Sequence, residues 1–129
     1  MKHSILIVDD NPGVSAPMAE YLEQGGFGVH VSHSAKEAIT ATQCKNYSLV
    51  ITDLRMETGS DEDGLNLIRH LRRSKPGLPI FILTASGAPE AATESYRLNV
   101  DKFIGKPIMM SRLLATVRDF LADFYKLAK

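Results

Sequence analysis

The chain has 129 residues, of which 44% are hydrophobic and 23% are charged, as in a globular domain rather than a disordered or membrane-spanning chain. Fifteen lysines and arginines balance fifteen aspartates and glutamates, so no basic field favours nucleic acid or an anionic membrane. The lone Cys44 excludes an internal disulfide and no apolar run approaches the length of a membrane span, so we expect one cytoplasmic domain over residues 1–129.

The first two predicted elements are a strand and a helix. Residues 5–8 form a short, continuous apolar run, which is typical of a strand buried on both faces of a parallel sheet. Apolar residues from Val14 to Leu22 then repeat at intervals of four and indicate a helix. Because proline is tolerated only in the first turn of a helix, Pro17 predicts that this helix begins near residues 14–16.

The middle of the chain repeats this pattern. Residues 27–32 are more polar and predict an edge strand. The sequence Ser-Ala-Lys-Glu at 34–37 is a capping box that begins a second helix. Residues 49–52 predict another buried strand, and the apolar spacing between 65 and 71 predicts a third helix.

The last part of the chain predicts two more strands and two more helices. Residues 80–83 read as a buried strand, 90–98 as an alanine-rich helix with a thin apolar stripe, 102–104 as a weak strand, and 113–124 as the clearest helix. Regular alternation of strands and helices favours an α/β fold, with a parallel sheet covered by helices on both faces. The chain is too short for an eight-fold barrel, so we expect a doubly wound five-stranded sheet that binds ligands at the carboxyl ends of its strands.

Polar residues follow the predicted strands at their carboxyl ends. Asp9 and Asp10 follow the first strand, Asp53 the third, Thr84 ends the fourth, and Lys106 follows the fifth. In a doubly wound sheet these residues would face one crevice, where three close carboxylates repel one another unless a cation such as Mg²⁺ is bound. A carboxylate held there is suited to attack phosphorus, with a lysine and a hydroxyl stabilising the phosphoryl oxygens.

Several short motifs together resemble the response-regulator receiver domain of bacterial two-component signal transduction, and the resemblance covers essentially the whole chain. It implies the flavodoxin-like strand order 2-1-3-4-5. It also implies a phosphoprotein that acts as a signalling switch and is not an enzyme beyond self-directed phosphotransfer and autodephosphorylation. The motifs lie at residues 7–10, 52–56, 63–65, 83–85 and 106–107.

The resemblance implies a phosphoacceptor beside a metal ion. Asp53 would accept the phosphoryl group. Asp10 would bind Mg²⁺, or Mn²⁺, directly, and Asp9 would bind it mainly through water. The backbone carbonyl of Arg55 would supply another metal ligand.

The resemblance also implies residues that respond to the phosphoryl group. Lys106 would pair with a phosphoryl oxygen, and the Thr84 hydroxyl would swing in to bond the group. Phe103 stands where the family keeps an aromatic switch, and the small Ala85 would leave the phosphoryl group accessible. The bond before Pro107 would be cis.

The sequence departs from the family pattern in the loop after Asp53. The loop as far as Gly64 is about three residues longer than usual, and Glu57 stands where proline is common. The acidic stretch 57–63 would either tune metal affinity or kinase docking, or form a solvated loop, which is the interpretation we favour. We also interpret the basic residues between 69 and 75 as a solvated helix face next to the negative end of the helix dipole.

The resemblance implies partners as well. A sensor histidine kinase or a phosphotransfer protein of a phosphorelay would donate the phosphoryl group. An output protein or a fused output domain would be controlled through the fourth helix, the fifth strand and the last helix. We expect no direct nucleic-acid or membrane binding, and either a monomer or a phosphorylation-linked dimer. The alternative is a degenerate receiver that acts as a phosphorylation-independent protein-interaction or dimerisation module.

Overall fold

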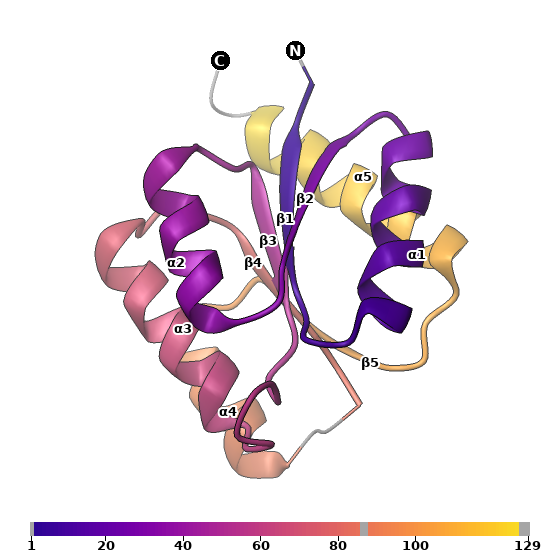
Figure 1. Ribbon diagram of the computed structural model, residues 1–129. Helices are drawn as coiled ribbons and strands as arrows, with labels where there is room; N and C mark the ends of the chain where they lie inside the picture. Colours follow the sequence, from indigo (N-terminus) through magenta and orange to yellow (C-terminus); the bar gives the residue numbers. More distant parts are fainter. Residues whose placement is uncertain (1, 86–87, 127–129) are drawn as a thin grey trace.

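The computed structural model describes residues 2–85 and 88–126, and over these residues strands and helices alternate as expected (Figure 1). The elements are β1 (Ser4–Val8), α1 (Pro12–Gln24), β2 (Gly28–Ser32), α2 (Ala35–Cys44), β3 (Leu49–Thr52), α3 (Glu62–Ser74), β4 (Ile80–Thr84), α4 (Pro89–Arg97), β5 (Lys102–Gly105) and α5 (Met110–Lys126).

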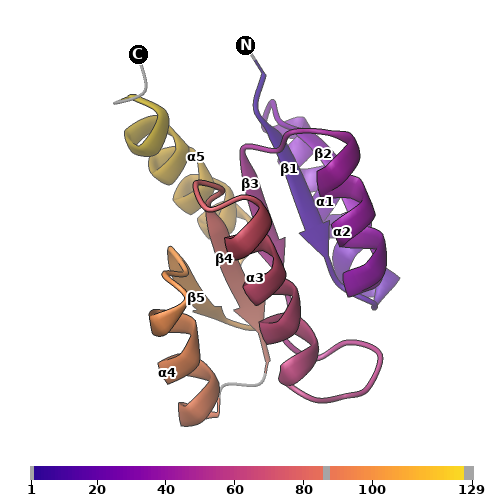
Figure 2. The same cartoon turned by 90° about the vertical axis from the view of Figure 1, so that its left-hand side faces the viewer.

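The five strands form one parallel sheet in the order β2-β1-β3-β4-β5, which confirms the predicted topology. Helices α1 and α5 cover one face, and α2, α3 and α4 cover the other (Figures 1 and 2). No helix of the described segments is long and apolar enough to cross a membrane.

Successive side chains of a strand point to opposite sides of the sheet. Because helices cover both sides, the central strands are buried on both faces. In β1, Leu6 and Val8 pack with α2 and α3, whereas Ile5 and Ile7 pack with α1 and α5. The two cores hold the sheet rigid between the helix layers, so the carboxyl ends of the strands are fixed in position.

The prediction that α1 begins near residues 14–16 is wrong, because the helix begins at Pro12. The Asn11 side chain caps it by accepting a hydrogen bond from the Gly13 N–H at 2.9 Å, and Pro12 occupies the first turn, where no donor is needed. Pro17 therefore lies inside the helix, on its exposed side. It offers no N–H to the carbonyl of Gly13, and Gly13 is an exposed residue as well.

The interpretation of the basic end of α3 as a solvated face is wrong for Arg72. Its side chain is only 15% exposed and donates hydrogen bonds to the carbonyls of Leu98 (2.8 Å), Leu78 (2.6 Å) and Asn99 (3.0 Å). Burial lowers the pKa of the Arg72 guanidinium, and Asp101 at 3.7 Å opposes that shift. Arg72 thus joins α3 to the end of α4 and to the segment before β4.

Replacing Arg72 with methionine is expected to lower the free energy of unfolding by about 2–3 kcal/mol, because three carbonyl groups lose a charged donor. Arg72→Lys is expected to restore little, since an ammonium cannot reach the three carbonyls as the planar guanidinium does. Urea denaturation measures both, with Arg73→Met on the same turn as the control, because Arg73 is exposed. Equal losses for the methionine variants at 72 and 73 would contradict this role.

Candidate functional site

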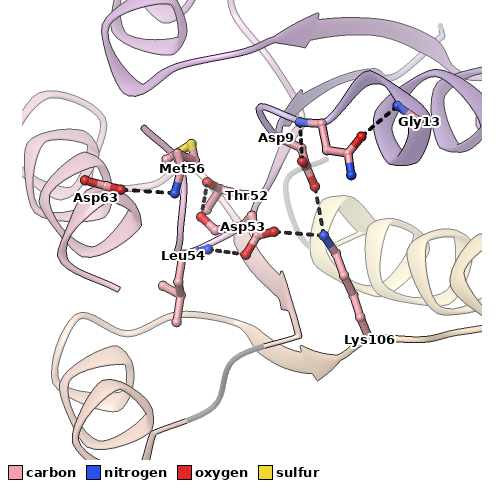
Figure 3. A network of polar contacts seen from close by, with 9 residues as sticks. Asp9, Gly13, Thr52, Asp53, Leu54, Met56, Asp63 and Lys106 are labelled. Carbon is pink, nitrogen blue, oxygen red and sulfur yellow. Dashed lines mark hydrogen bonds and ion pairs between the residues drawn. The ribbon is translucent and has the colours of Figure 1, made fainter. Parts of the chain in front are cut away.

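The structure brings Asp9, Asp53 and Lys106 together at the carboxyl edge of the sheet (Figure 3). Asp9 follows β1, Asp53 follows β3 and Lys106 follows β5. The Lys106 Nζ donates a hydrogen bond of 2.8 Å to Asp9 Oδ2 and another of 2.8 Å to Asp53 Oδ2. Residues from three separate strands therefore meet at one ammonium group.

These three side chains are largely shielded from water. The exposed fraction of the side chain is 5% for Asp9, 13% for Asp53 and 17% for Lys106. Burial alone would lower the pKa of Lys106, but its hydrogen bonds with Asp53 and Asp9 outweigh burial and raise the pKa. The lysine is therefore cationic at neutral pH, and two carboxylates with one ammonium carry about one net negative charge.

Each aspartate is oriented by the backbone as well as by Lys106. Asp9 Oδ1 accepts a hydrogen bond of 2.9 Å from the Asn11 N–H, and Asp53 Oδ1 accepts one of 2.7 Å from the Leu54 N–H. In both residues one oxygen is held by the backbone and the other by the lysine (Figure 3). The two carboxylates are thus preoriented by hydrogen bonds within the protein.

The other predicted site residues lie around this cluster. Thr84 is the buried last residue of β4, and its carbonyl accepts a hydrogen bond of 2.8 Å from the Lys106 N–H. Ala85 follows it and is exposed. Phe103 in β5 is half-buried against the core beneath α2, α3 and α4, and the peptide bond between Lys106 and Pro107 is cis.

The three aspartates expected at the site differ in their exposure. No three Asp, Glu, His or Cys side chains of residues 2–85 and 88–126 are placed to hold a metal ion together, and Asp10 is exposed whereas Asp9 is buried. Mg²⁺ uses only one or two carboxylates and completes its shell with carbonyl oxygens, water and phosphate. Asp9 and Asp53 supply the number of carboxylates that Mg²⁺ uses, whereas the binding of Mg²⁺ and the role of Asp10 as a direct ligand remain predictions.

The loop between β3 and α3 is held by Asp63, which belongs to the motif at 63–65 and to the acidic stretch 57–63 but was given no role of its own from the sequence. Asp63 Oδ2 accepts hydrogen bonds from the N–H groups of Met56 (3.0 Å) and Thr58 (3.1 Å), and Oδ1 accepts one from the Thr58 hydroxyl (2.6 Å). Partial burial works to raise the pKa of Asp63, but hydrogen bonds from Thr58 and Met56 outweigh it and lower the pKa. The loop is exposed at 57–60, as a solvated loop would be, yet Asp63 fixes its backbone.

Gly64 lets α3 approach the predicted phosphoacceptor closely. A Cβ at this position would lie 2.5 Å from the backbone oxygen of Asp53 and 2.6 Å from the Leu54 Cα, which no real side chain tolerates. The Gly64 N–H donates a hydrogen bond of 2.7 Å to the Leu54 carbonyl. In the sequence, Gly64 appeared only as part of the motif at 63–65, just before the predicted third helix, and this contact was not predicted.

A second arginine, Arg69, also connects α3 with α4. The Arg69 guanidinium pairs with Glu62 at 2.9 Å in the first turn of α3 and with Glu94 at 3.0 Å on α4. Hydrogen bonds with Glu62 and Glu94 raise the pKa of Arg69. The alanine-rich α4 is thus attached to α3 by this ion pair and, at its end, by Arg72.

Comparison with known proteins identifies the family. The family model of the response regulator receiver domain matches residues 5–118 of this chain. The chain therefore belongs to the response regulator receiver domain family. It is 32% identical over 117 residues to the transcriptional regulatory protein GlrR of Escherichia coli K12, which covers 91% of this chain. It is 35% identical over 122 residues to the response regulator Rre1 of Synechocystis, which covers 92% of this chain.

A solved structure shows the same fold. A CheY-like response regulator receiver domain protein from Methanospirillum hungatei superposes with a TM-score of 0.91 at 23% identity, over 98% of each chain. The chain spans about a quarter (26%) of GlrR and about half (52%) of Rre1. The similarity therefore concerns only part of each of those proteins.

Proposed function

We propose that Asp53 accepts a phosphoryl group from the phosphohistidine of a sensor histidine kinase or a phosphotransfer protein, and that the chain then switches an output protein or domain. The observation that carries this proposal is the Asp53 carboxylate, which Leu54 and Lys106 orient at the sheet edge beside Asp9. A shielded, oriented carboxylate next to a cationic lysine is the arrangement that attack on phosphorus needs.

In the transfer, a carboxylate oxygen of Asp53 forms a bond to phosphorus while the bond from phosphorus to the histidine nitrogen breaks, and the imidazole leaves with the electron pair. Lys106 already contacts Asp53 and is placed to neutralise a phosphoryl oxygen. Mg²⁺, or Mn²⁺, would be held by Asp53, Asp10, the Arg55 carbonyl and, mainly through water, Asp9, and it would supply positive charge toward the phosphoryl oxygens.

The new phosphoryl group carries a charge of about −1.5 to −2, which draws Lys106 and the Thr84 hydroxyl toward it. The change would reach α4, β5 and α5 as a shift between two packings of one fold. Three large apolar side chains are exposed in this region: Tyr96 on α4 (80%), Met109 just before α5 (73%) and Phe124 on α5 (40%). They would contribute to an output surface for a protein partner.

Intact-mass measurement after incubation with acetyl phosphate and Mg²⁺ tests the proposal. We expect the wild type to gain one phosphoryl group, and both Asp53→Asn and a chelator-treated sample to gain none. Absence of modification together with absence of beryllofluoride binding would overturn the phosphoacceptor function and favour the phosphorylation-independent interaction module.

A further inference from the structure

The peptide unit between Arg55 and Met56 is fixed by a side chain from the next helix. Its N–H, which belongs to Met56, donates a hydrogen bond of 3.0 Å to Asp63 Oδ2. In a planar trans peptide the C=O and the N–H point to opposite sides of the unit. The hydrogen bond that directs the Met56 N–H toward Asp63 therefore directs the Arg55 carbonyl away from Asp63.

The Asp63 carboxylate is itself prevented from turning. Both of its oxygens accept hydrogen bonds from Thr58, one from the N–H at 3.1 Å and one from the hydroxyl at 2.6 Å. Its backbone lies in the first turn of α3, which the Gly64 N–H joins to the Leu54 carbonyl at 2.7 Å. Met56 is therefore held relative to the segment that carries Asp53.

The direction of the Arg55 carbonyl is relevant to the proposed site. In the view of Figure 3, Asp63 approaches Met56 from the side opposite to Asp53. In this view, a carbonyl that points away from Asp63 is directed to the side of Met56 on which Asp53 lies. Glu57, which follows Met56, gives the backbone none of the restraint that a proline would.

We propose that Asp63 is a positioning residue that directs the Arg55 carbonyl toward the cation beside Asp53. This inference rests on the proposed function, because it assumes that a divalent cation binds there. Residues that orient metal ligands through hydrogen bonds contribute strongly to metal affinity even though they do not touch the metal. The negative charge of Asp63 has no part in this role; the position of its acceptor oxygen does.

Two substitutions separate position from charge. Asp63→Asn keeps an oxygen where the Met56 and Thr58 N–H groups donate, and its amide can donate to the Thr58 hydroxyl, but it removes the charge. Asp63→Glu keeps the charge and displaces the acceptor by one methylene group. Glu57→Gln is the matched control, since it removes one negative charge from an exposed position in the same loop.

Mn²⁺ binding, followed by the electron paramagnetic resonance signal of the free ion with Mg²⁺ as competitor, measures the affinity directly. We expect Asp63→Glu and Asp63→Ala to bind roughly tenfold more weakly than the wild type. Asp63→Asn and Glu57→Gln are expected to bind within about twofold of it, as the loss of one screened charge allows. Amide hydrogen exchange at Met56 is expected to quicken in Asp63→Ala and Asp63→Glu, and to stay as in the wild type in Asp63→Asn and Glu57→Gln.

The outcomes distinguish this inference from the function on which it rests. Equal Mn²⁺ binding by the wild type and Asp53→Asn would overturn the proposed cation site and this role with it. Binding by the wild type that is unchanged in Asp63→Glu would overturn the role of Asp63 alone. Loss of affinity in Asp63→Asn would also overturn it, because charge rather than position would then act. The Asn and Glu variants decide the matter even where circular dichroism shows that Asp63→Ala is unfolded.

Discussion

Replacing Lys106 with methionine is expected to lower the free energy of unfolding by about 2–3 kcal/mol in metal-free buffer, because it leaves two shielded carboxylates without their shared cation. Asp9 and Asp53 each give one oxygen to Lys106 at 2.8 Å, so both lose their partner in one substitution. The exposed fractions of these side chains are small, so solvent screens the effect only in part.

The pH dependence of this loss has a defined sign. The pKa of Lys106 is raised in the folded protein, so the lysine contributes stability fully below its unfolded value of about 10.4. That contribution disappears as the pH rises through the folded-state value. The difference between wild type and Lys106→Met is therefore expected to be constant from neutral pH to about pH 10 and to shrink above it.

Urea denaturation with a chelator present measures the loss. The double variant Lys106→Met with Asp9→Asn is expected to recover most of it, because a single carboxylate remains and the asparagine oxygen still accepts from the Asn11 N–H. Lys102→Met, at an exposed position in β5, is the matched control. No recovery in the double variant would show that repulsion between the two carboxylates is not the cause.

Gly64→Ala is expected to cost about 3 kcal/mol and to lower the midpoint of thermal unfolding by roughly 10 °C. The added methyl group would meet the Asp53 carbonyl oxygen at 2.5 Å and the Leu54 Cα at 2.6 Å. Both atoms belong to the backbone, so relief requires α3 to move away from β3. That movement would break the hydrogen bond between the Gly64 N–H and the Leu54 carbonyl.

Differential scanning calorimetry measures this effect, and Gly77→Ala provides the control. A Cβ at Gly77 would meet nothing within 4 Å, and its backbone does not require glycine. We therefore expect Gly77→Ala to be neutral or to stabilise by about 0.5 kcal/mol through the unfolded chain. Equal midpoints for the two alanine variants would contradict the close approach at Gly64.

The sheet and the core of the site could be predicted because their signals are local in the sequence. Continuous apolar runs such as 49–52 identify buried strands without knowledge of their partners. The parallel arrangement then places Asp9, Asp53 and Lys106 at one edge, whatever the details of the helices. The strand order itself came from the family resemblance rather than from periodicity.

The features that sequence reasoning missed depend on contacts between distant segments. Arg72 reads as one more cation at a helix end, and only the fold shows that three carbonyls from other segments converge on it. Asp63 reads as an acidic loop residue because hydrogen bonds from a side chain to the backbone leave no periodic pattern. The beginning of α1 was misplaced because Asn11 and Pro12 together outweigh the cost of Pro17.

The ion pair between Asp9 and Lys106 joins residues 97 positions apart in the sequence. During synthesis the ribosome releases Asp9 and Asp53 well before Lys106, so a nascent chain that ends within α4 contains the proposed acceptor Asp53 without its lysine. β5 is an edge strand of the sheet and the last strand in the sequence. A chain in which β5 has not yet joined the sheet therefore lacks Lys106 at the site. The three side chains come together only when the whole sheet has formed.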